Sequence, residues 1–243
     1  MDKEILKLFP QKAFKLLSIK DSLRIGAQVT KSLIDTEARQ NLILARQKNW
    51  KWNDIDFSKE DSSQETLSLT KEMGEKILKI YFSQFFEEDL AVHLDFGARS
   101  FYSNQKLVWI PSRLHYQFSK PFLKGVQSLY KGFYFDQPVD FENGLKLLGI
   151  IKTGMSEEKK QKVINLFLNH FGEGKVNPVQ FSSESLQKSF NAIFSFFLQE
   201  DIELNPEFAV LGINLVTLYL TLEEIPFALN VREAFLEVVE VKN

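Results

Sequence analysis

The chain has 243 residues, of which 44% are hydrophobic and 26% charged, as expected for one large globular domain or two small ones. It contains no cysteine, which excludes disulfide frameworks, thiolate catalysis and cysteine-based metal centres. Its three histidines do not suggest a histidine metal cluster, and the formal net charge of −2 argues against a nucleic-acid partner. The 23 phenylalanines predict a core built largely from aromatic rings.

The charge is unevenly distributed along the chain. Residues 1–53 carry eleven Lys or Arg against five Asp or Glu, whereas the chain from Glu200 onward carries nine acidic and two basic residues. Basic amphipathic segments can lie on anionic membranes. We expect residues 3–48 either to make such a peripheral contact or to pack against the chain's own acidic region.

Two further features predict a cytoplasmic protein. The N-terminus lacks the apolar stretch of a signal peptide. The longest apolar run, residues 208–222, is shorter than the roughly 20 residues of a membrane span and is interrupted by Asn214, Thr217 and Thr221. We therefore expect this run to be a helix buried in the core.

Apolar residues recur at helical spacing along most of the chain, which predicts a mainly α-helical bundle with at most one short β-hairpin. Helices are expected over residues 12–18, 23–47, 62–86 and 121–135, and others begin at Ser156, Ser183 and Asn205. Two extended stretches, 90–94 and 106–110, are expected to pair as the hairpin. We expect residues 1–61 to form an N-terminal helical segment and connection, and residues 62–243 to form one continuous core.

Several helix ends have recognisable chemistry. Ser62 and Glu65 have the spacing of a capping box, and Ser156 precedes two glutamates that suit a helix start. Gly172 is a typical helix terminator. His170, near that terminus, is expected to be an imidazolium stabilised by the helix dipole.

The segment 92–97 contains Asp95-Phe96-Gly97, which allows two interpretations. In kinases an Asp-Phe-Gly carboxylate holds Mg²⁺ against nucleotide phosphates. Alternatively, Asp95 caps a turn at the end of a strand, and Gly97 adopts a positive φ. The residues alone favour the turn.

A longer pattern resembles the AarF/UbiB family of atypical kinase-like proteins. Residues 74–95 run through a helix ending Gln84-Phe85-Phe86-Glu87 into His93 and Asp95, which is similar to that family's approach to its catalytic loop. The similarity continues through 106–110, 122–150 and the helix after Asn205, covering about 170 residues by pattern rather than identity. The resemblance implies a kinase-like C-terminal lobe.

The resemblance also implies that the chemistry of the family is incomplete here. His93 and Asp95 fall on the family's histidine and catalytic aspartate, but Ser100 and Pro111 fall on its two metal ligands. Residues 38–61 are too few for a strand-rich lobe that would cover a nucleotide. Because phosphoryl transfer depends on Mg²⁺ to neutralise phosphate charge, we expect no cofactor.

Three functions remain open. The first is a non-catalytic, pseudokinase-like binding or regulatory protein, which the resemblance would link to quinone or lipid metabolism, with a protein partner or an apolar small molecule. The second is a helical interaction module unrelated to kinases. The third is a residual phosphotransferase that uses ATP, Mg²⁺ and Asp95, with His93 beside it. Residues 133–135 and 194–197 either line a pocket for an isoprenoid or acyl chain or are simply core.

Overall fold

The computed structural model describes residues 16, 19–49, 52–58, 69–86, 91–97, 100–103 and 107–240. The helices are α2 (Ile19–Ile34), α3 (Thr36–Asn49), α4 (Lys71–Phe86), α5 (Lys120–Tyr134), α6 (Pro138–Leu147), α7 (Glu157–Phe171), α8 (Ser183–Gln199), α9 (Glu207–Glu223) and α10 (Val231–Glu240). The strands are β1 (Ile55–Phe57), β2 (Val92–His93), β3 (Phe101–Ser103), β4 (Leu107–Trp109) and β5 (His115–Tyr116). The predicted mainly α-helical class is confirmed.

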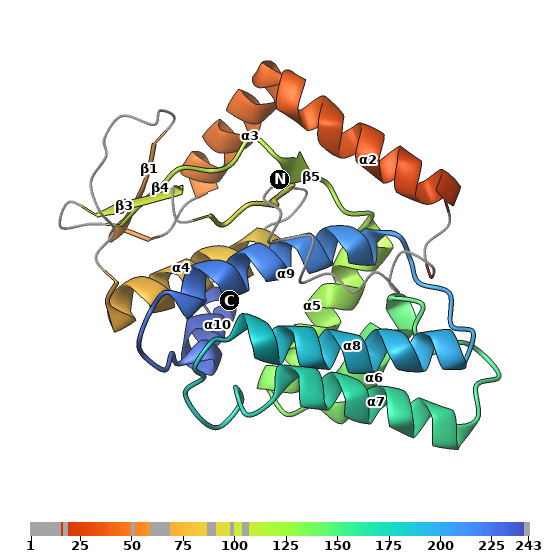
Figure 1. The fold of residues 1–243 in the computed structure, drawn as a ribbon. Coiled ribbons are helices and arrows are strands. Elements are labelled where there is room, and N and C mark those ends of the chain that lie inside the picture. The colour runs from red at the N-terminus through yellow and green to blue at the C-terminus, as the bar shows by residue number, and fades with distance from the viewer. Residues whose placement is uncertain are drawn as a thin grey trace.

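The helices from α4 onward form the body of the molecule, and α2 and α3 lie across its top in Figure 1, next to the short strands. Buried apolar side chains from Leu16 to Val239 form one cluster, in which phenylalanine is prominent as the composition predicted. Ile25 and Ile55 belong to this cluster, so the N-terminal elements share the same core. No described helix is long and apolar enough to cross a membrane.

The strands form two small sheets. In the first, β4 pairs antiparallel with β3 and parallel with β1, with Trp109 opposite both Phe101 and Phe57. In the second, β2 pairs antiparallel with β5, with His93 opposite His115. The expected pairing of residues 90–94 with 106–110 is therefore wrong, because each stretch finds a partner elsewhere.

The helices of the C-terminal half follow their sequence signals closely. The Ser156 hydroxyl accepts a hydrogen bond from Lys159 N at the start of α7, and Gly172 ends that helix at φ 59°. In α8 the apolar residues at 3 and 4 spacing are buried as predicted: Leu186, Phe190, Ile193, Phe194 and Phe197.

The N-terminal half departs from the expected boundaries. The predicted helix over 23–47 is divided, because the Asp35 carboxylate accepts from Ala38 N and starts α3 there. The predicted helix over 62–86 is too long: residues 69 and 70 are not helical, and the Thr70 hydroxyl accepts from Met73 N at the start of α4. The capping box at Ser62 and Glu65 and the predicted helix over 12–18 lie outside the described residues, apart from Leu16.

Helices α5 and α6 approach each other closely because glycines line their contact. A β-carbon added at Gly132 would lie 2.1 Å from the backbone nitrogen of Phe141, and one added at Gly144 would lie 2.6 Å from that of Leu129. Both neighbours are backbone atoms, so neither can move aside without shifting a helix. The contact fixes α5, whose other face packs on α4.

We expect Gly132→Ala to lower the free energy of unfolding by about 3 kcal/mol, since the added methyl group forces the two helices apart. Gly26 in α2 is the matched control, because a β-carbon there meets nothing within 4 Å. Gly26→Ala should raise stability by about 0.5–1 kcal/mol through helix propensity. Urea unfolding of both variants tests this, and equal effects would contradict the close contact.

Candidate functional site

The pairing of β2 with β5 brings the two chemistry-bearing segments of the sequence together. Leu94 N donates to Leu114 O at 2.9 Å, and His93 Nδ1 lies 2.9 Å from Ser112 O. Residues 92–97, which contain Asp95, therefore lie beside residues 110–116, which contain Pro111. These are the segments in which a kinase-like lobe would carry its catalytic and metal-binding carboxylates.

Three polar side chains on one face of α9 hold the first of these segments in place. Asn214 Nδ2 donates to His93 O at 2.8 Å, and Thr217 Oγ1 donates to Leu94 O at 2.9 Å. Thr221 Oγ1 donates to Phe96 O. All three side chains are buried, so they satisfy carbonyls that water does not reach.

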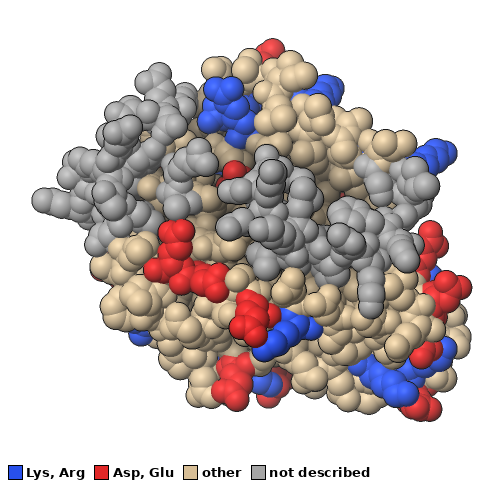
Figure 2. Space-filling model, in the orientation of Figure 1, with Lys and Arg blue, Asp and Glu red and all other residues tan. Residues whose placement is uncertain are grey.

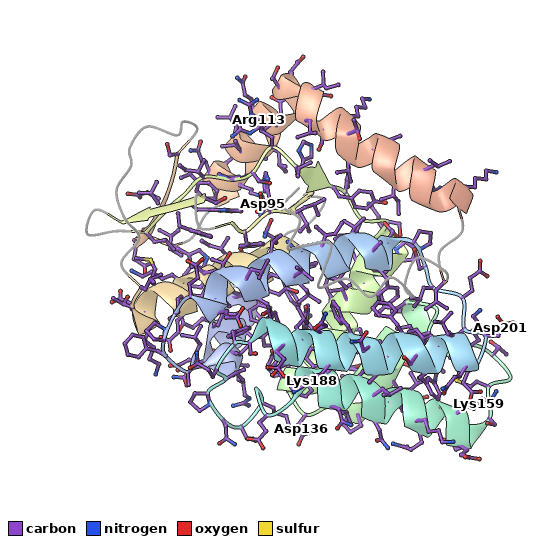
Figure 3. The ribbon with its side chains drawn as sticks, viewed as in Figure 1. Asp95, Arg113, Asp136, Lys159, Lys188 and Asp201 are labelled. Carbon is purple, nitrogen blue, oxygen red and sulfur yellow. The ribbon has the colours of Figure 1, made fainter. Side chains whose placement is uncertain are left out.

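The carboxylate of Asp95 closes a local turn. Its Oδ1 accepts a hydrogen bond from Gly97 N at 2.8 Å, as the turn interpretation of this motif predicted. Gly97 does not have the positive φ that the same interpretation predicted; its small size instead leaves room for the carboxylate, because a β-carbon there would lie 3.0 Å from Asp95 Oδ1. Figure 3 shows Asp95 between the strands and α9, with Arg113 nearer to α3.

His93 is fully buried and electrically neutral. Burial lowers the pKa of its imidazole well below the ordinary value, and the nearby charge of Arg46 lowers it further. Because Ser112 O can only accept, Nδ1 carries the proton. Nε2 then has a free lone pair and no hydrogen-bond partner among the described residues. The side chain of His93 is 0% exposed, so its ring nitrogens have no contact with solvent.

Helix α3 covers the site with two arginines. Arg39 Nη2 donates to Pro111 O at 3.2 Å, and Arg46 donates to Ala91 O. The Arg46 guanidinium also lies 5.7 Å from the centre of the Trp109 ring. Burial and the neighbouring charge of Arg113 lower the pKa of Arg39. Helix α3 thus binds the backbone next to both segments of the site.

The resemblance places the family's two metal ligands at Ser100 and Pro111, and neither residue supplies a carboxylate. Among the described residues, no group of three or more His, Asp or Glu side chains is arranged to hold a metal ion.

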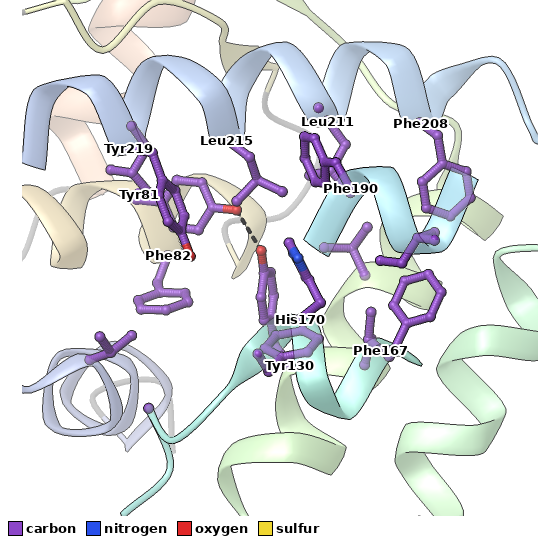
Figure 4. Close-up of a pocket in the computed structure, with 18 of the residues that line it drawn as sticks. Tyr81, Phe82, Tyr130, Phe167, His170, Phe190, Phe208, Leu211, Leu215 and Tyr219 are labelled. Atoms are coloured by element: carbon purple, nitrogen blue, oxygen red, sulfur yellow. Dashed lines mark hydrogen bonds between the residues drawn. The ribbon is translucent and has the colours of Figure 1, made fainter. Parts of the chain in front are cut away.

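A second site lies within the helical body, between α4, α5, α7, α8 and α9. It is a cavity of about 120 Å³ lined almost entirely by buried apolar and aromatic side chains. Tyr134, Phe194 and Phe197, which the sequence suggested as either pocket or core, lie on its wall. In Figure 4 the hydroxyls of Tyr81 and Tyr130 are joined by a hydrogen bond, 2.5 Å long.

His170 also lines this cavity, and its predicted charge is wrong. Burial lowers the pKa of its imidazole to about 4, so the ring is neutral where the helix dipole alone would favour an imidazolium. Its Nδ1 lies 2.9 Å from the Ser189 hydroxyl. The loss of hydration around the imidazole lowers its pKa more than the dipole of the helix end raises it. Only the position at the helix end can be read from the sequence.

The residues that position the first site are partly visible in the sequence. Asn214, Thr217 and Thr221 interrupt an otherwise apolar run at spacings of 3 and 4, which places them on one face of a helix. This spacing indicates a row of polar side chains along one face of a buried helix. Arg39 and Arg46 give no comparable signal, because arginines of an exposed helix have the same spacing.

We expect Thr217→Val to lower the free energy of unfolding by about 1–2 kcal/mol, since the buried carbonyl of Leu94 loses its donor while the side-chain volume stays nearly the same. Thr153 is exposed, so Thr153→Val should change stability by less than about 0.5 kcal/mol. Chemical unfolding measures both. Equal effects of the two substitutions would contradict the anchoring role of Thr217.

Stability should fall as the solution is acidified below about pH 6.5. There the unfolded chain binds protons at His93 and His170, whereas the folded chain does not, because burial lowers both pKa values. With the pKa of His170 at about 4, this residue alone should cost about 2 kcal/mol between pH 7.5 and pH 5. Urea unfolding at several pH values tests this. His170→Gln should flatten the dependence, and an unchanged slope in this variant would contradict the burial effect.

The sequence was also compared with known protein families and curated proteins. No protein-family model matches the sequence, and no curated protein matches it. The resemblance to the AarF/UbiB family therefore depends on the residues and motifs given above. The chain thus has two candidate sites, one around Asp95 and His93 and the other around the cavity.

Proposed function

We propose that the chain is a non-catalytic, pseudokinase-like binding or regulatory protein that resembles the AarF/UbiB family. The observation that carries this proposal is the pairing of β2 with β5, which sets residues 92–97, with Asp95, beside residues 110–116, where the resemblance implies a metal-binding aspartate and this chain has Pro111. The link to quinone or lipid metabolism comes from the resemblance alone.

The order of elements supports the kinase-like part of the proposal. A helix, α4, leads into β2 and the Asp95 turn; a short hairpin, β3–β4, follows; then come the Pro111 segment, β5 and a series of helices. The resemblance implies this succession. An interaction module unrelated to kinases would have no reason to bring the Asp95 and Pro111 segments together.

The contacts of the site support the non-catalytic part. The Asp95 carboxylate accepts from its own turn, and His93 is buried and neutral. Arg39 of α3 binds the backbone at Pro111, the position at which the resemblance implies a metal ligand. A triphosphate entering this site would meet an aspartate without Mg²⁺, at a cost of several kcal/mol at an effective dielectric constant of about 20.

We expect no binding of Mg·ATP tighter than millimolar in a calorimetric titration of the full chain. Asp95→Asn and Asp95→Ala give the matched pair, because the amide oxygen of Asn can still accept from Gly97 N, whereas Ala cannot. Asp95→Asn should therefore keep nearly full stability, and Asp95→Ala should lose about 1 kcal/mol. A micromolar dissociation constant that both substitutions abolish would instead support the phosphotransferase.

A peripheral membrane contact is a second candidate role, and the exposed face of α2 favours it. Leu23, Ala27, Thr30 and Ile34 share one helix face, and all four are exposed; Leu23 is 70% and Ile34 78% exposed. Lys20 and Lys31 flank this face, and basic side chains lie over α2 and α3 in Figure 2. An apolar face with basic neighbours suits an anionic lipid surface.

We expect the full chain to co-sediment with anionic vesicles, more weakly as salt rises, and not with neutral vesicles. Leu23→Ser with Ile34→Ser should reduce this binding. Val139 and Val176 are each 72% exposed but lie outside α2, so serines at these two positions form the control and should leave binding unchanged. Equal sedimentation of both double variants, or none by the unaltered chain, would end the membrane role.

A further inference from the structure

The cavity of the helical body is large enough for a small molecule. Its volume is about 120 Å³. An apolar cavity of about 150 Å³ lined by Leu, Ile and Phe side chains is known to stay dry and to bind benzene. The cavity therefore suits a ligand of about one ring and is too small for a long isoprenoid or acyl chain. Aromatic walls such as Phe167, Phe190 and Phe208 offer edge and face contacts to such a ring.

The wall also offers hydrogen-bond donors that the protein does not use. Tyr81 and Tyr130 bond to each other, so one of their two protons serves that bond and the other has no partner among the described residues. Tyr219 and Tyr134 line the same cavity. Burial raises the pKa of all four phenols, to about 12 for Tyr219, so each keeps its proton at neutral pH.

His170 supplies a further polar group on the same wall. The Ser189 hydroxyl lies 2.9 Å from both Leu186 O and His170 Nδ1, and its single proton can serve only one of these two bonds. In either tautomer of the neutral ring Nε2 remains available, as an acceptor when Nδ1 carries the proton and as a donor when it does not. No hydrogen bond to Nε2 occurs within the described part of the chain. The cavity thus presents unused phenol donors and one imidazole nitrogen in otherwise apolar surroundings.

Water alone fills such a space poorly. A buried water molecule usually makes about three hydrogen bonds, and most of this wall is aromatic or aliphatic. A ligand that is apolar over most of its surface and carries one polar group matches the wall better. A hydroxyl group is a small group that can accept from a tyrosine and can also serve either tautomer of His170, by donating to Nε2 or by accepting from it.

We propose that this cavity binds a small, single-ring molecule that carries one hydroxyl group, with the ring against the phenylalanine side chains and the hydroxyl among Tyr81, Tyr130 and His170. The proposal deepens the proposed function by naming a ligand class. It relies on that function only for the expectation that the chain binds a molecule without transforming it, because the cavity is separate from the Asp95 site.

Phenol and toluene are matched probes, since they differ only in a hydroxyl in place of a methyl group. Their dissociation constants would be measured by calorimetry with the full chain. We expect both to bind, and Tyr81→Phe with Tyr130→Phe to weaken phenol about tenfold relative to toluene. His170→Leu should have the same relative effect. Tyr116, whose hydroxyl lies outside the cavity and donates to Glu207, is the control, and Tyr116→Phe should leave the ratio unchanged.

Leu211→Phe fills the cavity from α9 and should abolish binding of both probes while the chain stays folded. If that variant does not fold, the ratio measured in the tyrosine and histidine variants still decides. Failure of both probes to bind the unaltered chain, or a ratio that neither variant changes, would overturn the proposal. Tight Mg·ATP binding would overturn the non-catalytic function without affecting these probe measurements.

Discussion

The hydrogen bonds from α9 to the segment of His93 are the interaction on which the arrangement of this protein depends. Strands β2 and β5 contain two residues each, which is too short for a ladder to hold the segment alone. Asn214, Thr217 and Thr221 bind the carbonyls of residues 93, 94 and 96, each of which would otherwise cost about 1–3 kcal/mol as a buried group without a partner. A helix near the end of the chain thus fixes a turn more than a hundred residues earlier.

The same bonds explain how an apolar helix finds its orientation. Helix α9 is apolar on most of its surface, so burial alone would accept many rotations about its axis. Only one rotation brings three buried polar side chains onto three carbonyls. That rotation also turns Leu211, Leu215 and Tyr219 toward α4, α5 and α8, where they form one wall of the cavity. The two sites are therefore linked through a single helix.

The parts of the fold that local chemistry decides could be predicted from the sequence. Ser156 and Gly172 begin and end α7, and the apolar spacing of α8 identifies its buried face. Strand pairing could not be predicted, because strands of two or three residues are too short for an alternation of apolar and polar side chains that would identify their partners. Residues 90–94 were matched to 106–110 as neighbours in sequence, whereas β2 pairs with β5 and β4 lies between β1 and β3.

In the candidate sites, too, local features could be predicted from the sequence and features that depend on packing could not. The turn at Asp95 is local and was predicted as one of two interpretations. The neutral state of His170 depends on the helices packed around it, and the spacing of residues along the sequence does not reveal that packing. The hydrogen bond from Arg39 to Pro111 O joins residues 72 positions apart, so local spacing could not predict it. Whether Tyr134, Phe194 and Phe197 would line a cavity or fill a core was decided only by how five helices meet.

The parallel pairing of β1 with β4 has a consequence for the synthesis of this chain. Residues 55–57 leave the ribosome some 50 residues ahead of their partners at 107–109, and chains grow at about 5–20 residues per second. Until those partners are made, Ile55, which is buried in the finished molecule, lacks the strand that pairs beside it. Strand β1 therefore completes its sheet only after β4 has been synthesised.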